Sequence, residues 1–383
     1  MAPHPPDTPA TEPDTLAAAA PWAHGAAYVR PLDLRGRIDL THGAGGRATH
    51  QLVSELFLPA FAPAGAPPSG SGRHASPPGE DAAVLGADCS PPAGHRLVLS
   101  TDAHVVSPLC FPGGDIGRLG VHGSVNDLAM MGAQPLCLSV SFILEEGLPL
   151  ADLQQVARSM GEAAREAGVR IATGDTKVVE RGKADRLYLS VSALGHVAPG
   201  VTLSATQARP GDAILLSGRV GEHGLAVLSQ RQGLQFDAPI ASDTAALHRL
   251  VAAMLASGAR LRLLRDPTRG GVATALNEIA ASSGVGMVLE EAAVPLQPAV
   301  SAACELLGLD ALYLANEGKL LAICAPDDAD ALLATMRAHP LGQDAARIGT
   351  VVADPHGFVQ ARTALGGVRL LDWLSGDPLP RIC

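Results

Sequence analysis

Apolar residues recur along this chain with two different spacings, one typical of helices and one typical of strands. Over residues 150–167 they return every three or four positions, which places them on one face of an α-helix. The residues on that face are Leu150, Leu153, Val156, Ala157, Met160, Ala164 and Ala167. The short apolar runs RLVLST (96–101) and LCLSVSFIL (136–144) are typical of strands, and a helix is predicted between them over 115–132.

The same mixture of periods continues through the second half of the chain. Strands are predicted over 169–173, 187–195, 211–218, 284–290, 318–325 and 346–353, and helices over 243–256, 270–282 and 327–338. From about residue 200 a similar mixture of predicted strands and helices begins again. We therefore predict two α+β domains of similar size, over residues 37–199 and 200–374.

Three segments lack this periodicity. Residues 1–36 are rich in Pro, Ala and Thr and are predicted to be a flexible tail, and residues 62–79 are predicted to be a flexible surface loop. Residues 375–383, which carry two prolines and a glycine, are predicted to form an extended C-terminal arm.

Composition narrows the class of protein. Apolar residues make up 47% of the chain and charged residues 17%, as in a globular protein. The net charge of −10 argues against nucleic-acid binding, and no apolar run is long enough to span a membrane. The six cysteines are scattered without CxxC spacing and no signal peptide is visible, so we expect a reduced, cytoplasmic protein.

Acidic residues fall repeatedly beside small residues, at the ends of predicted strands or at turn positions. Any one of them is typical of a turn, but several that follow strands in one chain favour the oxygen ligands of Mg²⁺, which usually shares its shell with phosphate. The motifs are GEDAAVL with Asp81, STDAHVV with Asp102, SVNDLAMMG with Asn126 and Asp127, ATGDTKVV with Asp175, and LRDPTRGG with Asp266. We predict the five aspartates as metal ligands.

Two glycine turns are candidates for phosphate binding, because backbone amides at a helix N-terminus attract anions. HGAGGRA contains Gly43, Gly45 and Gly46, and DPTRGGVATALNEIA contains Gly270 and Gly271. Neither turn fits the Walker A motif. The first matches G-x-G-x-x-A, but a Pro-rich loop stands where a dinucleotide-binding fold needs a βαβ unit.

The last residue is a cysteine, Cys383. A neighbouring α-carboxylate disfavours the thiolate, so a terminal cysteine is a poor fixed nucleophile. On an extended arm it suits a carrier, which collects a group at one site and delivers it to another. An accidental terminal cysteine is an equally good interpretation on spacing alone.

Three other side chains are candidates for chemistry, each with a commoner structural role. Lys177 follows Asp175, where a lysine is usually solvated. Glu278 lies on the flank of an apolar helix stripe and could act as a general base near a phosphate site, although most helix-surface glutamates are only solvated. His104, like His122, lies near the acidic motifs, but a lone histidine is more often structural.

Several motifs together resemble the HypE family of hydrogenase maturation factors. They are the block from STDAHVV through FPGGDIG to SVNDLAMMGAQP, then FILEEGLPL, TGDTKVVERG, DPTRGGVATALNEIA, ELLGLDALYLANEGKL and the closing PRIC. The resemblance runs from about residue 38 to 383. DPTRGG is shared with aminoimidazole ribonucleotide synthetases and selenophosphate synthetases, from which the terminal thiol distinguishes this chain.

The resemblance implies a two-domain fold of the aminoimidazole ribonucleotide synthetase type, in a homodimer whose N-terminal strands form a shared barrel. It also implies a carbamoyl dehydratase that uses ATP. A carbamoyltransferase, HypF, would load Cys383, and dehydration of the S-carboxamide to a thiocyanate would supply cyanide for the iron of [NiFe]-hydrogenase. The HypC–HypD complex would be the further partner, as the iron scaffold.

The resemblance also suggests roles for residues. Glu278 is predicted as the base that removes the N–H protons, Lys177 as a contact for the phosphates or the developing oxyanion, and His104 as an auxiliary proton carrier. The predicted binding set for ATP and Mg²⁺ is Gly43, Gly45, Gly46, Asp81, Asp102, Asn126, Asp127, Thr173, Gly174, Asp175, Lys177, Asp266, Arg269, Gly270 and Gly271.

Two alternatives stay open at this point. The protein could be a non-catalytic carrier whose thiol arm is gated by nucleotide, or another ATP-dependent synthetase of the same fold in which the thiol has no role.

Overall fold

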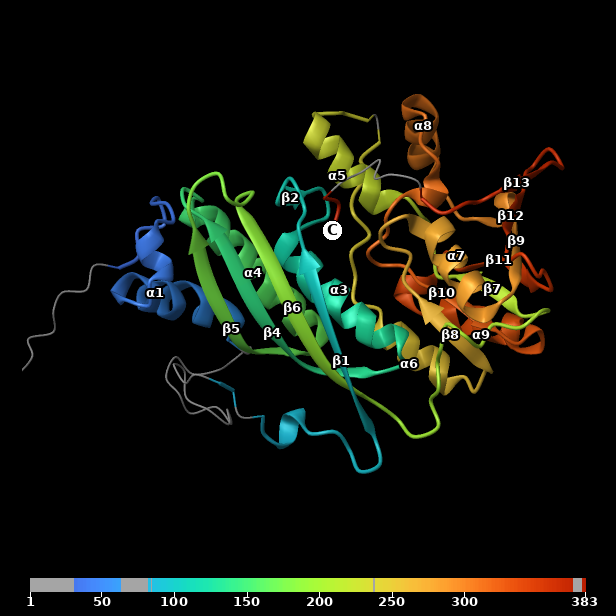
Figure 1. Cartoon of the computed structure of the whole chain (residues 1–383), viewed down its shortest axis with the longest axis horizontal. Coiled ribbons are helices and arrows are strands. Elements are labelled where there is room, and N and C mark those ends of the chain that lie inside the picture. The colour runs from blue at the N-terminus through green and yellow to red at the C-terminus, as the bar shows by residue number, and fades with distance from the viewer. Residues whose placement is uncertain (1–30, 63–81, 84, 237, 375–380) are drawn as a thin grey trace, which may run out of the picture.

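The computed structural model describes residues 31–62, 82–83, 85–236, 238–374 and 381–383. Most of the predicted N-terminal tail and of the 62–79 loop, together with Asp81 and residues 375–380 of the predicted arm, lie outside these ranges. Figure 1 shows two lobes, with the C-terminus returning to the junction between them beside β2 and α3.

The N-terminal lobe is a four-stranded sheet in the order β1-β6-β4-β5, in which β4 and β5 are parallel and the other pairs antiparallel. In Figure 1 the strands lie in front of helices α3 and α4, which cover the rear face. The strands are β1 (Arg96–His104), β4 (Gln134–Glu145), β5 (Arg170–Val179) and β6 (Leu187–Val197), with a small hairpin of β2 (Cys110–Phe111) and β3 (Gly114–Asp115). The helices are α1 (Arg47–Leu52), α2 (Leu58–Phe61), α3 (Ile116–Met130) and α4 (Leu150–Ala167).

Helix α4 shows why the sequence pattern predicts this lobe well. All seven residues of its predicted apolar face are buried, and the helix ends at Gly168, whose φ of +71° is the left-handed conformation typical of a C-terminal cap. Helix α3 packs so closely on α4 that a Cβ at Gly117 would lie 2.4 Å from the carbonyl oxygen of Val156. Glycine at that position is therefore what allows the two helices to approach.

The C-terminal lobe is built on a seven-stranded sheet in the order β13-β12-β9-β11-β7-β10-β8. Strand β7, in the interior of this sheet between β11 and β10, is buried on both faces, because one apolar cluster fills the side of α7 and another fills the side of α6 and α9. The strands are β7 (Ala213–Leu216), β8 (Leu261–Arg265), β9 (Gly286–Glu290), β10 (Leu321–Cys324), β11 (Ala346–Val352), β12 (Val359–Arg362) and β13 (Val368–Leu370). The helices are α5 (Glu222–Gln232), α6 (His248–Ala256), α7 (Gly271–Ser283), α8 (Pro298–Leu307) and α9 (Ala329–Ala338).

The predicted elements agree with the structure except in a few places. The prediction of a helix over 243–256 is wrong at its start, because α6 begins at His248 and residues 243–247 have no regular secondary structure. The pattern did not predict α5, α8, β8, β12 or β13, most of which are short or lack a clear apolar period. Within the described ranges no helix has the length and apolar character that a membrane crossing requires.

Candidate active site around the terminal cysteine

The last three residues are held in a seat at the junction of the lobes. The side chain of Ile382 is only 2% exposed and packs into the core of the N-terminal lobe. The backbone N–H of Val105 donates to a terminal carboxylate oxygen of Cys383 at 3.0 Å, and that of Ser107 donates to the carbonyl of Arg381 at 3.2 Å. The tip of the predicted arm is therefore fixed to the segment that follows β1.

Side chains from α5 and from the β5–β6 connection complete this seat. Arg231 donates to the carbonyl of Arg381 at 2.7 Å, and the Nε2 atom of His223 lies 2.8 Å from the carbonyl oxygen of Ile382. The guanidinium of Arg381 forms an ion pair with Asp185.

The thiol of Cys383 is kept protonated by this environment. Burial raises its pKa to about 12, and the negative charge of Glu317 adds to the increase. The guanidinium of Arg269, which donates to Sγ at 3.3 Å, opposes the increase without cancelling it. A seated Cys383 is thus a neutral thiol, which is a weak nucleophile.

Among the acidic groups, Glu317 has the largest effect on the pKa of the Cys383 thiol. The sequence motifs did not single it out. The residue is buried, and its Oε1 atom has no hydrogen-bond partner among the described residues. Burial raises its pKa well above the usual range, and the charges of Asp266, Asp243, Asp102 and Asp127 raise it further. Its signal was the motif ANEGKL, in which Glu317 lies four residues before the first residue of the wholly apolar strand β10.

Three of the predicted aspartates gather around Glu317. Burial raises the pKa of Asp266 to about 6, with a further contribution from Asp127, and burial likewise raises the pKa of Asp127. Asp102 acts on both carboxyl groups, and the hydroxyl of Ser100 donates to Asp127. These acids repel one another, as expected where a cation normally offsets their charge.

The donor set fits Mg²⁺, because it consists of carboxylate oxygens whose mutual repulsion a divalent cation would relieve. In the part of the chain that the structure describes, no three such side chains enclose a metal ion by themselves. Mg²⁺ commonly binds one or two carboxylates and completes its shell with water and phosphate oxygens, so the arrangement is consistent with a shared metal.

Two further predicted residues, His104 at the end of β1 and Asn126 on α3, lie beside this cluster. The ring of His104 fits against Gly123, where a Cβ would lie 3.1 Å from it, and its Nε2 atom lies 3.4 Å from Asp102 Oδ2 without a hydrogen bond. Burial lowers the pKa of His104, and the charge of Asp102 opposes this. Asn126 donates to the carbonyls of Ala245 and Glu317, so both of its N–H groups serve the fold rather than a ligand.

The DPTRGG turn lies at the thiol end of this cluster. Gly270 and Gly271, with φ of +78° and +61°, open helix α7, and a Cβ at Gly271 would lie 2.5 Å from the carbonyl oxygen of Leu312. The turn thus carries Arg269 to Cys383.

A second group of predicted residues lies on β5 and in the glycine turn beside it. Lys177 and Asp175 are ion-paired at 2.9 Å, with side chains 66% and 61% exposed. Thr173 and Gly174 belong to the same strand, and the turn of Gly43, Gly45 and Gly46 lies beside it, since a Cβ at Gly43 would be 2.7 Å from the Val178 nitrogen.

The two groups are on opposite edges of the N-terminal sheet. The register runs from Asp102 through Val191 and Val140 to Gly174, which is three strand spacings. At about 4.8 Å per spacing, the strands that carry Asp102 and Asp175 are about 14 Å apart. The residues predicted from the motifs as one site therefore form two separate groups within one chain, which are candidate half-sites.

Glu278 belongs to neither half-site. Its carboxylate forms an ion pair with Arg265 on the partly exposed side of α7. The acidic groups that act most strongly on the thiol of Cys383 are instead Glu317 and Asp102.

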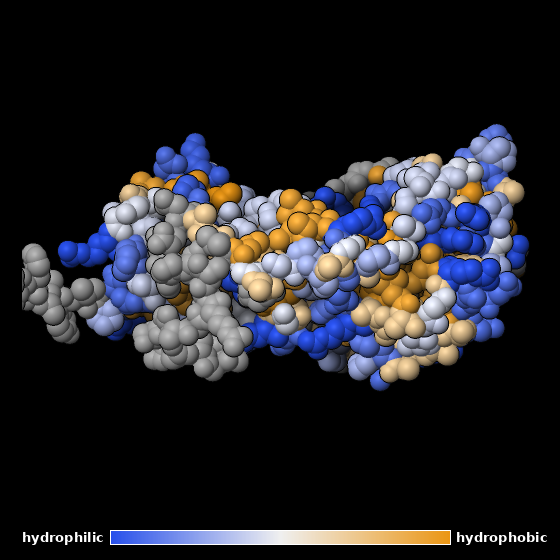
Figure 2. Space-filling model, turned by 90° about the horizontal axis from the view of Figure 1, so that it is seen from below, coloured by the Kyte–Doolittle hydropathy of each residue, from blue (hydrophilic) through white to orange (hydrophobic). Residues whose placement is uncertain are grey.

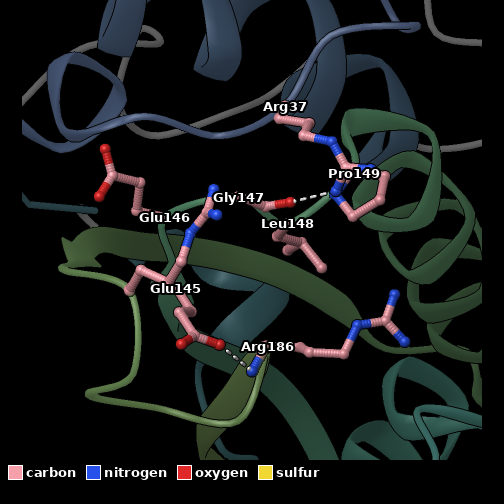
Figure 3. Close-up of a pocket in the computed structure, with 8 residues that line it drawn as sticks. Arg37, Glu145, Glu146, Gly147, Leu148, Pro149 and Arg186 are labelled. Atoms are coloured by element: carbon pink, nitrogen blue, oxygen red, sulfur yellow. Dashed lines mark hydrogen bonds between the residues drawn. The ribbon is translucent and has the colours of Figure 1, made fainter.

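A hollow of about 610 Å³ lies at the end of β4 and β5. Lys177 pairs with Ile143, and Glu145, which lines the hollow, pairs with Val179 two residues further along. Figure 3 shows that its wall includes Arg37, whose guanidinium donates to the carbonyl of Gly147 at 2.7 Å, and Arg186, whose backbone N–H donates to Glu145 at 2.9 Å. The hollow therefore adjoins the half-site of Lys177, away from the thiol.

Two family models and several curated sequences match this chain. The models describe AIR synthase related proteins, with the N-terminal domain matching residues 79–197 and the C-terminal domain residues 209–362. The protein named carbamoyl dehydratase HypE from Cupriavidus necator is 60% identical over 357 residues, which are 93% of this chain and 98% of that protein. Its namesake from Escherichia coli strain K12 is 45% identical, over 90% of this chain and 99% of that protein.

Solved structures agree with the sequence matches. A structure described as HypE in complex with ATP has a TM-score of 0.82 and 48% identity, over 90% of this chain and 99% of that one. A HypE–HypF complex gives a TM-score of 0.71 and 46% identity, over 77% and 93%. AaThiL, at 19% identity, a TM-score of 0.57 and coverage of 75% and 88%, shares the fold alone. With this two-domain fold and these matches over nearly its whole length, the chain belongs to the HypE family of hydrogenase maturation proteins.

Proposed function

We propose that this protein is a carbamoyl dehydratase that uses ATP to convert an S-carboxamide on Cys383 into a thiocyanate, which supplies the cyanide ligand for [NiFe]-hydrogenase iron. The observation that carries this proposal is the seat of the terminal thiol beside Glu317 and an acidic cluster suited to Mg²⁺. Relatives of this chain are named for that dehydration, and one was solved with ATP.

The reaction requires a phosphoryl transfer because an amide oxygen is a poor leaving group. Transfer of the γ-phosphoryl group to the carbamoyl oxygen makes that oxygen part of a phosphate, which then leaves with the C–O bond. Both amide hydrogens leave as protons, and the carbon–nitrogen bond becomes triple. The products are the thiocyanate, ADP and phosphate, with the sulfur–carbon bond intact throughout.

Glu317 is the base that this geometry supports, in place of Glu278. A carboxylate is a more effective proton acceptor when its pKa is raised toward the working pH, and the burial of Glu317 raises its pKa in that way. His104 stays the auxiliary proton carrier in this proposal, because its buried Nε2 atom has no hydrogen-bond partner and its ring is held neutral. Arg269 is assigned to hold the sulfur and to offset the charge that develops next to it.

ATP and Mg²⁺ are assigned to the two half-sites. Asp102, Asp127 and Asp266 would hold Mg²⁺, which offsets phosphate charge when bound. Lys177 and Asp175, with the amides of the glycine turn, would contact the phosphates from the other side. The hollow at the end of β5 offers space beside Lys177 for the nucleoside part. Asp81 stays a predicted ligand outside the described residues.

A homodimer would bring the two half-sites together. The front face of the N-terminal sheet is uncovered in Figure 1, and Leu97 and Leu99 on β1 are 58% and 72% exposed there. Figure 2 likewise shows patches of apolar surface on both lobes. Pairing of β1 and β5 with a second copy would close a barrel and place Lys177 of one chain opposite Asp102 of the other. We propose this dimer as the active form.

The proposed partners follow from the same chemistry. The arm must receive its carbamoyl group from a carbamoyltransferase, and a relative of 46% identity was solved in complex with HypF. It must then deliver cyanide to an iron scaffold, which we propose is the HypC–HypD complex in the cytoplasm.

The test is a partner-free assay of the carbamoylated protein with Mg-ATP. Dehydration on this chain predicts that the C-terminal peptide loses the mass of one water while phosphate is released in equal amount. If neither occurs and ATP only changes the accessibility of the arm, the protein is a nucleotide-gated carrier. If the protein without Cys383 still turns over a small substrate with ATP, it is a different synthetase of this fold.

A further inference from the structure

A short segment without regular secondary structure, residues 242–247, connects the seat of the arm to the buried acid. Both carboxylate oxygens of Asp243 accept from the backbone at Glu317 and Gly318, at 3.0 and 3.2 Å. The Ala245 N–H donates to the Glu317 carbonyl at 3.4 Å. A Cβ at Gly318 would lie 1.8 Å from the Asp243 carbonyl oxygen, so the two backbones are in direct contact. Glu317 is thus held in place by this segment.

His223 connects the same segment to the arm. Its ring is fully buried in α5, with Nδ1 2.7 Å from the hydroxyl of Ser242 and Nε2 2.8 Å from the carbonyl oxygen of Ile382. The edge of the ring meets Phe111, with centroids 5.3 Å apart. Burial lowers the pKa of His223, so the ring is neutral and carries one N–H. A carbonyl oxygen can only accept, so Nε2 carries the proton and Nδ1 accepts from Ser242.

We infer that His223 is a positioning residue that ties the peptide next to Cys383, through Ser242, to the segment that holds Glu317, and so sets the place of the reacting sulfur relative to the acid. The inference rests on the proposed function for its catalytic readout only. Its other readout, the accessibility of the thiol, is independent of any reaction.

The position of this hydrogen bond explains why it matters. The Ile382 carbonyl is the last peptide group before Cys383, and the terminal carboxylate is held by Val105. With both ends of the final residue fixed, rotation about the Cys383 side-chain torsion is the main freedom left to Sγ. Loss of the His223 donor would leave a buried carbonyl unpaired, which weakens the seat by about tenfold or more in its occupancy.

The test measures two properties of His223→Leu, His223→Gln and Ser242→Ala in the full chain. The first is the rate at which iodoacetamide alkylates Cys383, followed by mass spectrometry of the C-terminal peptide. The second is the single-turnover rate of thiocyanate formation at saturating Mg-ATP, with the KM for ATP. His223→Leu is expected to alkylate at least about tenfold faster and to react more slowly at an unchanged KM. Ser242→Ala leaves every contact of the arm in place. It is expected to change each rate in the same direction as His223→Leu does, with faster alkylation and slower turnover.

His223→Gln is the rescue variant, because its amide nitrogen can reach the place of Nε2 and donate to Ile382. It is expected to restore most of the protection and of the turnover. His339→Gln, at the far end of the C-terminal lobe, is the control and should match the native protein. Thermal unfolding checks that each variant is folded.

If a folded His223→Leu variant is alkylated at the native rate, the hydrogen bond from His223 does not hold the arm in its seat. Unchanged rates in a folded Ser242→Ala, or a glutamine variant no better than leucine, would overturn the link through the ring. If the native protein forms no thiocyanate, the proposed function fails, and the alkylation comparison still decides the role of His223.

Discussion

At the scale of single residues, the site joins a weak nucleophile to an acid with an unusually high pKa. A neutral seated thiol does not attack other groups, which suits a sulfur that has already been loaded before it enters the seat. Glu317 and Asp266, with raised pKa values, are favoured as proton acceptors and as partners of a cation rather than as stabilising charges. In the proposed function the repulsion between these acidic groups has a purpose, because it raises the pKa of the proton acceptor and favours the binding of a cation.

Replacement of the two competing acids decides which of them is the base. Glu317→Gln is expected to lower the single-turnover rate of thiocyanate formation by at least about a hundredfold, because the amide cannot accept the proton. Glu278→Gln, which breaks only the ion pair with Arg265, is expected to stay within about threefold of the native rate. Quenched-flow measurement of both variants is sufficient, and the reverse order would restore Glu278 as the base.

Cys383→Ala separates the carrier role from nucleotide binding. The variant is expected to form no thiocyanate, since it cannot be carbamoylated, but to bind ATP with its native affinity because the proposed phosphate contacts lie elsewhere. Isothermal titration with a non-hydrolysable ATP analogue measures this. A large loss of affinity would show that the terminal residue belongs to the nucleotide site and argue against a pure carrier.

At the scale of elements, the close packing of α3 on α4 positions the site. Helix α3 carries Asn126 and Asp127 to the junction of the lobes, and its rear face rests on α4. Residues 243–247 were predicted as the start of a helix. They have no regular secondary structure, because polar groups of the segment 242–247 pair with Glu317, Asn126 and Pro112 instead. Local propensity is overridden there by long-range hydrogen bonds.

Gly117→Val tests the contact between the two helices. The added side chain would meet the Val156 carbonyl, so the variant is expected to lose about 2 kcal/mol or more of unfolding free energy. Urea denaturation followed by circular dichroism measures the loss. Arg158→Ala on the exposed face of α4 is the control and should change stability by less than about 0.5 kcal/mol. Equal stability of the two variants would mean that the helices can move apart freely.

At the scale of the whole molecule, the distance between the half-sites predicts that one active site draws on two chains. Mixing Cys383→Ala with Lys177→Ala is expected to recover activity, because the mixed dimer contains one site with both native groups. At equal mixing, about a quarter of the native activity is the statistical expectation for randomly exchanged subunits. Assay of the mixture against each variant alone checks this, and no recovery after confirmed subunit exchange would place the complete site within one chain.

Buried histidines predict how the folded state responds to acid. Burial lowers the pKa of His248 from 6.5 to about 4. Between these two values the unfolded chain binds a proton that the folded chain does not, so this residue makes stability fall as the pH drops from 6.5 to 4. The slope for one histidine is about 1.4 kcal/mol per pH unit. Urea denaturation at several pH values should show a flatter profile for His248→Gln, and parallel profiles would contradict the lowered pKa.

The amino-acid pattern by itself determined the local secondary structure and which reactive and binding side chains the chain carries. Helix α4 follows from its own spacing because one apolar face is enough to define it, and the terminal cysteine and DPTRGG motif point to a family through residues close in sequence. Asp102, Asp127 and Asp266 were predicted together with Asp81 and Asp175, because each one stands beside small residues at a predicted strand end or turn. In the structure Asp102 lies in β1, Asp127 in α3, and Asp266 directly after β8.

Only the tertiary structure decided which groups meet. Glu317 becomes a candidate base because burial and four distant carboxylates raise its pKa, and neither is visible in ANEGKL. Lys177 is separated from Asp102 by the order of the strands, which motif spacing does not encode. The seat of Cys383 depends on His223 and Arg231, contacts more than a hundred residues away along the chain. Burial, strand order and long-range contacts are properties of the packed chain, so they appear only once it has folded.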